Sequence, residues 1–268
     1  MGNRDLVLTG IPRSGTSLMC DLLDRHVNVA VVNESLTQSE RAIYELTGSD
    51  NFDVGQFHHV FGEFYRNMRD SVWLGEPILA KSGTDTRLRN ERTVYRPTNL
   101  ESEDFLLGTK KTLLYLIMLP YVVSHPDGYR IVAMVRNPRD TISSWIGSFK
   151  HLRDASVPEI FRSFSFESEF FSDQEQCSIQ QIAAESDVSV RRCRLWRFLH
   201  DRIVSFRDQI EIVKYEELIL SPSAIIGEAV GVRELRTSTP RITNKSSRSY
   251  LSSEDHEHID EYCGFYDG

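Results

Sequence analysis

The stretch GIPRSGTS, residues 10–17, decides the fold that the sequence predicts. Gly10, Gly15 and Ser17 are in register with the phosphate-binding loop G-x-x-x-x-G-K-[ST]. Thr16, however, stands where that loop has its lysine. The stretch therefore predicts a loop that binds an anion, and the missing lysine raises the question of which anion it binds.

The sequence around this loop supplies the expected context. Residues 5–9 are a short β-rich run, and residues 17–26 carry leucines at helical spacing. Further strands are predicted at 27–34, 105–111, 129–136 and 211–215, and helices at 39–46, 55–69, 112–124, 186–206 and 253–263. Asn137 and Pro138 predict a helix start, and residues 75–98 are predicted to be loops.

The repeated order of strand and helix predicts one fold class. It is typical of a parallel sheet with right-handed crossovers, whose ligands bind at the carboxyl ends of the strands. With 268 residues, we expect a single α/β domain over 1–268: a central parallel sheet flanked by helices, of the P-loop nucleotide-binding type. Residues 35–105 and 150–185 are expected to be insertions that bind the second substrate.

Composition and charge restrict the partners. The formal net charge of −8 argues against nucleic-acid binding, which needs an excess of Lys and Arg. No apolar run is long enough to span a membrane. The four cysteines are far apart and form no CxxC pair, so we expect reduced thiols, no bound metal and a cytoplasmic location.

The missing lysine disfavours a triphosphate. In ATPases that lysine neutralises the terminal phosphates, so phosphoryl transfer is poorly supported here. What remains is a cluster of backbone N–H groups at a helix N-terminus, with Arg13 as its cation. Such a loop suits an anion of lower charge, and a phosphosulfate fits that description.

Two motifs together give a resemblance. GIPRSGTSLM resembles the 5′-phosphosulfate loop of the sulfotransferases that use 3′-phosphoadenosine 5′-phosphosulfate (PAPS), and VRNPRDTISSW resembles their 3′-phosphate motif. KYEELILSP is similar to another strand end of that family. The resemblance implies that Arg136 and Ser144, eight residues apart, bind the 3′-phosphate. It also implies PAPS contacts from Arg13, Ser14, Gly15, Thr16 and Ser17, and it leaves Tyr215 either touching adenine or simply packing.

Within that family, PRSGTSLMCDLLDRHVNVAVVNE is similar to the tyrosylprotein sulfotransferases and their bacterial relatives. This likeness implies that Glu34, 21 residues after Arg13, is the catalytic base. The histidine that cytosolic members place after Lys-Thr is replaced by Leu113. A competing interpretation is that Glu34 caps a helix that begins near Ser35.

Some assignments stay open. Neighbouring strand residues face opposite ways, so only one of Lys110 and Lys111 is expected to point at the sulfate, and the resemblance favours Lys111 as a catalytic residue. Ser246, Ser247 and Arg248 either close over the cofactor or form a surface loop. His256 and His258 are expected to lie on a solvated helix rather than to bind a metal.

The sequence thus predicts a PAPS-dependent O-sulfotransferase that needs no metal. Its acceptor is expected to be a small molecule with a hydroxyl group, and peptidyl tyrosine is an alternative. The phenylalanines and tyrosines of the two insertions, including Phe57, Phe61, Phe64, Tyr65, Phe161 and Phe164, suggest an apolar or aromatic acceptor or else belong to the core. The alternatives are an ATP-dependent P-loop kinase and a phosphoadenosine-binding protein without catalysis; the oligomeric state stays open.

Overall fold

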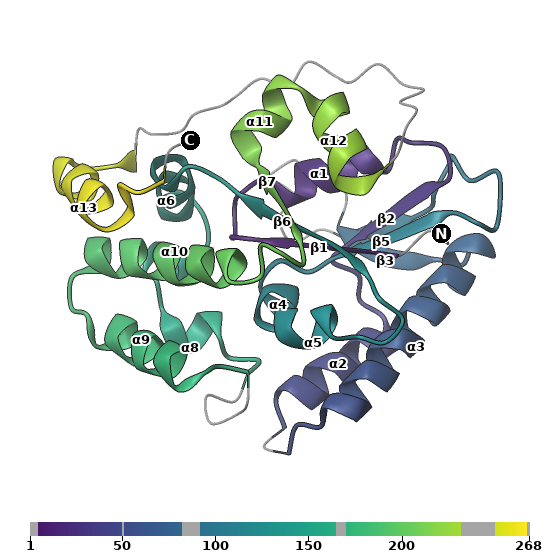
Figure 1. Cartoon of the computed structure of the whole chain (residues 1–268), viewed down its shortest axis with the longest axis horizontal. Coiled ribbons are helices and arrows are strands. Elements are labelled where there is room, and N and C mark those ends of the chain that lie inside the picture. The colour runs from purple at the N-terminus through teal and green to yellow at the C-terminus, as the bar shows by residue number, and fades with distance from the viewer. Residues whose placement is uncertain (1–4, 50, 82–91, 165–169, 232–249, 267–268) are drawn as a thin grey trace.

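The structure is a computed structural model that describes residues 5–49, 51–81, 92–164, 170–231 and 250–266. In this part of the chain, a parallel sheet with strand order β2-β5-β1-β6-β7 forms the centre of the molecule (Figure 1). Its strands are β1 (Leu6–Gly10), β2 (Val29–Asn33), β5 (Leu106–Lys110), β6 (Arg130–Val135) and β7 (Glu211–Lys214). The predicted α/β architecture with a central parallel sheet is confirmed.

Helices cover both faces of the sheet. α1 (Thr16–Leu23), α11 (Tyr215–Leu220) and α12 (Pro222–Val230) lie above it in Figure 1, and α4 (Thr112–Ile117), α5 (Leu119–Val123) and α10 (Val188–Val204) lie below it. The remaining helices are α2 (Gln38–Thr47), α3 (Val54–Trp73), α6 (Pro138–Ile146), α7 (Lys150–Arg153), α8 (Val157–Ile160), α9 (Asp173–Ala184) and α13 (Ser253–Cys263). None of the helices in the described ranges combines the length and the apolar character that crossing a bilayer requires.

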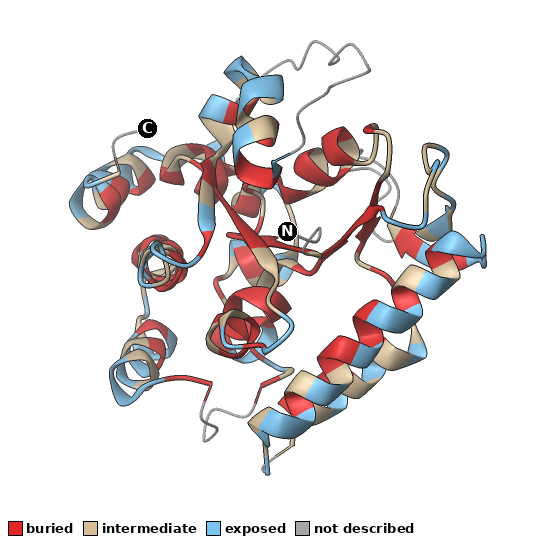
Figure 2. Cartoon of the chain, turned by 45° about the vertical axis from the view of Figure 1, so that its right-hand side comes forward, coloured by how far each residue is buried: buried red, intermediate tan, exposed pale blue. Residues whose placement is uncertain are grey.

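The core follows from this double cover. Side chains of β1 alternate between two buried clusters, since Leu6 and Leu8 face one layer of helices and Val7 faces the other. All five residues of β1, β2 and β5 are buried, as expected of parallel strands covered on both sides. Figure 2 shows the buried sheet and helices whose buried sides face inward.

The prediction of loops over residues 75–98 was wrong in part. β3 (Ile78–Lys81) and β4 (Arg92–Tyr95) form an antiparallel pair beside the main sheet. Their alternation is short, with Ile78 and Ala80 buried and Leu79 exposed, and nearby glycine and proline obscured it in the sequence. The predicted helix over 112–124 is also broken, at Met118, because Pro120 begins a new helix rather than continuing the first.

The aromatic residues of the insertions belong to the core. Those that suggested an acceptor pocket are at most 7% exposed: Phe57, Phe61, Phe64, Tyr65, Phe161 and Phe164. They pack into the larger of the two buried clusters. Apolar side chains along α10 are likewise core, with Trp196, Leu199 and Ile203 fully buried. These aromatics therefore say nothing about the acceptor.

Candidate active site at the carboxyl edge of the sheet

Predicted site residues follow all the strands of the main sheet, at the edge where parallel strands end. In sheet order, Glu34 follows β2, Lys110 ends β5, the loop 10–17 follows β1, Arg136 follows β6 and Tyr215 follows β7. The prediction that these strand ends share one edge is confirmed. This edge is where α/β sheets of this kind bind their ligands.

The loop after β1 is fastened to the neighbouring strand and helix. The Ile11 amide and the Ser14 hydroxyl both donate to the Met134 carbonyl, at 3.0 and 2.9 Å. The indole N–H of Trp145 donates to the Pro12 carbonyl at 2.8 Å. Ser14 thus anchors the loop with its side chain and also with its backbone, since its amide donates to the Ile11 carbonyl at 3.0 Å.

Unusual backbone conformations mark the predicted residues. The described non-glycine residues with positive φ are Arg13 at 74°, Glu34 at 49°, Asn28 and Ala155. Residues with side chains are uncommon in this region, and strained ones concentrate at functional sites. Gly15, at φ 94°, lies so close to the Tyr215 ring that a Cβ atom would overlap it. The geometry is therefore specific for glycine at this position.

The loop leads directly into the N-terminus of α1. The Met19 amide is bonded to the Gly15 carbonyl at 3.0 Å, so the amides between them lie in the first turn, where a helix leaves them without intrahelical partners. The Thr16 hydroxyl lies 3.4 Å from the hydroxyl of Thr112, which is the first residue of α4 and directly follows Lys111. These free amides and the helix dipole give the site the positive potential that an anion requires.

The two motifs meet although they are far apart in sequence. The Arg13 Nε donates to the Ser144 hydroxyl at 3.0 Å, across 131 residues. Arg136 donates to the Arg13 carbonyl at 3.4 Å, and its guanidinium lies 4.3 Å from the centre of the Tyr215 ring. Ser144 is placed by α6, whose first turn is capped by the Asn137 side chain. The fold thus gathers Arg13, Arg136, Ser144 and Tyr215 into one cluster.

Arg136 has capacity for a ligand. The residue is only 9% exposed, yet its Nε atom is buried without a hydrogen-bond partner. Leaving a buried charged donor unsatisfied is costly, and most such groups in proteins are paired. A phosphate oxygen at this position would accept the missing hydrogen bond. The residues present therefore fit a phosphate group.

Glu34 lies at the centre of a second cluster. One carboxylate oxygen is 2.5 Å from the Lys110 Nζ, and the other forms an ion pair with Lys81 of β3. Arg92 of β4 donates to the Glu34 carbonyl at 2.7 Å. Burial raises the pKa of Glu34, but Lys110 and Lys81 outweigh burial and hold this pKa well below its usual value. The carboxylate is ionised at neutral pH, and its side chain is 21% exposed.

Lys111 points to a different carboxylate. It forms an ion pair with the buried Glu40 and donates to the Ser35 carbonyl at 3.1 Å. Burial lowers the pKa of Lys111 to about 8, opposed by the charge of Glu34. The structure thus pairs Lys110, rather than Lys111, with Glu34, and the choice of Lys111 as the residue that faces the sulfate stays a prediction.

The competing role for Glu34 is not borne out. The N-cap of α2 is Thr37, whose hydroxyl accepts a hydrogen bond from the Glu40 amide at 3.2 Å. Lys81 and Arg92, which hold Glu34 in place, were missed by sequence reasoning because the hairpin that carries them was predicted to be loop. Only the short alternation of buried and exposed residues in β3 could have indicated the hairpin.

The C-terminal part of the chain supports the second motif. Arg139 of α6 contacts His256 and Asp260 of α13. His256 therefore interacts with an arginine.

In the described part of the chain, one group of side chains has the geometry of metal ligands, namely Asp187, Glu254 and His258. Asp187 already caps α10. Ser246, Ser247 and Arg248 lie outside the described residues.

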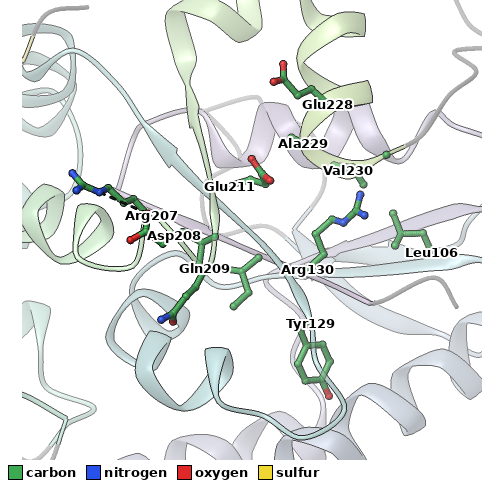
Figure 3. Close-up of a pocket in the computed structure, with 13 residues that line it drawn as sticks. Leu106, Tyr129, Arg130, Arg207, Asp208, Gln209, Glu211, Glu228, Ala229 and Val230 are labelled. Atoms are coloured by element: carbon green, nitrogen blue, oxygen red, sulfur yellow. Dashed lines mark ion pairs between the residues drawn. The ribbon is translucent and has the colours of Figure 1, made fainter. Parts of the chain in front are cut away.

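A cavity of about 740 Å³ opens at the opposite, amino edge of the sheet (Figure 3). Its lining includes Arg130 and Arg207 but also Asp208, Glu211 and Glu228. This lining holds more acidic than basic side chains, so it is poorly suited to a nucleotide with several phosphates. The carboxyl edge remains the candidate active site.

Comparison with known proteins identifies the family of the chain. Residues 5–230 match the model of the sulfotransferase family. The match covers the loop after β1, Glu34 and the second motif, and the chain belongs to this family. A comparison of the sequence with curated proteins found no match.

Solved structures of sulfotransferases resemble the chain over its whole length. A sulfotransferase from Alicyclobacillus acidocaldarius is 14% identical, with a TM-score of 0.44, and the match covers 98% of this chain and 96% of the other. Sulfotransferase STF9 from Mycobacterium avium is 13% identical, with a TM-score of 0.43 and coverage of 100% and 78%. The sulfotransferase domain of the Synechococcus PCC 7002 olefin synthase is 14% identical, with a TM-score of 0.42 and coverage of 99% and 89%.

Proposed function

We propose that the protein transfers a sulfuryl group from PAPS to a hydroxyl group of a small-molecule acceptor. Membership in the sulfotransferase family supports sulfuryl transfer in general. The observation that carries the donor assignment is the cluster of Arg13, Arg136, Ser144 and Tyr215, which joins the two predicted nucleotide motifs. A location in the cytoplasm is part of the proposal, because the four cysteines are free thiols.

Each part of the cluster has a role in binding the donor. The amides of Gly15, Thr16 and Ser17, together with Arg13, would hold the 5′-phosphosulfate. Arg136 and Ser144 would hold the 3′-phosphate, which supplies the acceptor that the buried Nε of Arg136 lacks. Tyr215, packed between Arg136 and Gly15, limits the space at this end of the site.

The reaction needs positioning and charge more than covalent chemistry. The acceptor oxygen forms a bond to sulfur while the bond from sulfur to the 5′-phosphate oxygen breaks. The acceptor proton passes to Glu34, which Lys110 and Lys81 keep ionised. Arg13 and Lys111 would stabilise the charge on the bridging and sulfonate oxygens, and no metal is required for this step.

Binding of the product nucleotide tests the donor assignment. Without magnesium, 3′-phosphoadenosine 5′-phosphate (PAP) at about 100 times its Kd should raise the Tm by roughly 5–10 °C, since a ligand at that ratio stabilises the native state by about 2.7 kcal/mol. ATP should have a weaker effect. Arg136→Ala should abolish most of the shift in differential scanning fluorimetry, whereas Arg207→Ala, a largely exposed arginine, should not. An intact shift in Arg136→Ala would contradict the 3′-phosphate site.

Removing the proposed base tests the chemistry. Glu34→Gln should lower kcat roughly 10²- to 10⁴-fold in transfer from radiolabelled PAPS to 1-hexanol, because the proton acceptor is lost. PAP binding should persist. Glu34→Asp keeps the charge beside Lys81 and Lys110 and should recover part of the rate, and the half-exposed Glu63→Gln serves as control. Unchanged turnover in Glu34→Gln would assign the base to another residue.

A further inference from the structure

Three apolar side chains beside Glu34 are exposed to solvent. Leu36, Leu79 and Val94 are 49%, 48% and 47% exposed, and we refer to them as the apolar ladder. Leu79 and Val94 face each other as partners across the β3–β4 hairpin. The Leu36 amide donates to the Leu79 carbonyl at 3.0 Å, so Leu36 lies beside the same strand. The apolar ladder thus consists of one cross-strand pair and a third exposed residue bonded through its backbone to the same strand.

The register of the hairpin places Leu79 and Val94 on the same face as the groups that hold Glu34. Lys81 and Arg92 are the next pair facing that side, two residues along each strand from Leu79 and Val94. Lys81 forms an ion pair with the Glu34 carboxylate, and Arg92 donates to its carbonyl. Leu79 and Val94 thus share one face of the hairpin with the two residues that hold the candidate base.

The other face of the hairpin is already used. Ile78 and Ala80 are 3% and 1% exposed, and the Tyr95 hydroxyl contacts Asp24. The hairpin is therefore fastened to the core by one set of side chains, while the other set points outward. The directly opposed leucine and valine stabilise the hairpin as a cross-strand pair, and burial of their exposed surface by a bound molecule would be favourable in addition.

The spacing defines the size of the molecule. Leu79 precedes Lys81 by two residues of β3, a step of about 7 Å along the strand. An acceptor with its hydroxyl at the Glu34 carboxylate therefore needs an apolar body of about five carbons or more to reach the apolar ladder. Glu34 is 21% exposed, so its carboxylate is accessible from this side.

We infer that the apolar ladder binds the apolar body of the acceptor, and that the acceptor is an alcohol or phenol with an extended uncharged hydrocarbon part. This inference rests on the proposed sulfuryl transfer and names the class of its second substrate. It replaces the core aromatics as the basis for an apolar acceptor. Leu79 and Val94 become the residues that determine specificity.

A series of primary alcohols tests the inference. Transfer from radiolabelled PAPS is measured with ethanol, 1-butanol, 1-hexanol and 1-octanol. In the unmodified protein, kcat/KM should rise by up to about threefold to fourfold per methylene once the chain reaches the apolar ladder. The double variant Leu79→Thr, Val94→Thr keeps β-forming residues in the hairpin. It should lower the ratio of 1-octanol to ethanol at least tenfold, whereas Leu220→Thr, an 81% exposed leucine in α11, should not.

The possible outcomes separate this inference from the proposed function. An unchanged octanol-to-ethanol ratio in the double variant overturns the role of the apolar ladder. A tyrosine-containing acidic peptide that outperforms 1-octanol, or the absence of transfer to any alcohol while PAP still raises the Tm, overturns the acceptor class and leaves the donor assignment standing. If PAP also fails to raise the Tm, the proposed function fails.

Discussion

Arg13 and Glu34 both adopt backbone conformations that residues with side chains rarely take. Such a conformation costs on the order of 1–3 kcal/mol, so the surrounding contacts must hold it. For Arg13 these contacts come from Ser144 and Arg136, and for Glu34 from Lys81, Arg92 and Lys110. Two of the four described non-glycine residues with positive φ therefore lie where the chemistry is proposed.

The pKa of Lys111 gives a prediction at this scale. Because burial lowers this pKa to about 8, the side chain loses its charge as the pH rises through that value. If Lys111 stabilises the transferred sulfonate, kcat/KM should fall roughly tenfold per pH unit above it. Lys111→Arg should keep its charge and lose this alkaline limb, with the exposed Lys150→Arg as control. A flat profile to pH 10 would contradict this role of Lys111.

Among the elements outside the sheet, α13 packs against the helix that carries the second motif. It contacts α6 through Arg139 and α10 through Asp255. The Asp255 carboxylate accepts hydrogen bonds from Ser189 and Ser252 and from Arg192 at 2.7 Å. These contacts support α6, and with it Ser144 at the proposed 3′-phosphate site.

Asp255→Ala should destabilise the protein by about 3 kcal/mol at pH 7, because it removes a helix cap and leaves the largely buried Arg192 unpaired. Burial raises the pKa of Asp255, but the hydrogen bonds and Arg192 outweigh it and lower this pKa below its usual value. The stabilisation is therefore present above the unfolded pKa, about 3.9, and is lost as pH falls through the lower folded value. Urea unfolding at pH 7 and pH 3 measures this difference. The exposed Glu254→Ala is the control, and a difference of similar size at both pH values would rule out the charged pair.

The elements also show where sequence patterns suffice. The strands of the main sheet were predicted to within two residues, because continuous apolar runs ending in glycine or charge have few other interpretations. The β3–β4 hairpin was missed, because four residues per strand carry too little alternation to be recognised. That omission hid Lys81, Arg92 and the apolar ladder together.

For the whole molecule, the strand order of the sheet brings strand ends that are far apart in sequence close together in space. Glu34 and Arg136 lie 102 residues apart, yet the order β2-β5-β1-β6-β7 brings their strand ends to the same edge as the loop. Right-handed crossovers between parallel strands make this arrangement the usual result of the strand and helix order. The general place of the site could therefore be predicted before any side chain was positioned.

The sequence by itself determined the parallel α/β fold, the anion-binding loop and the residues of both nucleotide motifs. It did so because glycines, prolines and apolar runs fix the backbone and burial of their own segments. The spacing between motif residues can also be read directly from the sequence. Only the tertiary structure decided that Lys81 and Lys110 hold Glu34, that Lys111 pairs with Glu40, and that Arg136 retains an unpaired buried donor. Those facts depend on side-chain contacts between segments far apart in sequence, and such contacts exist only once the sheet has assembled.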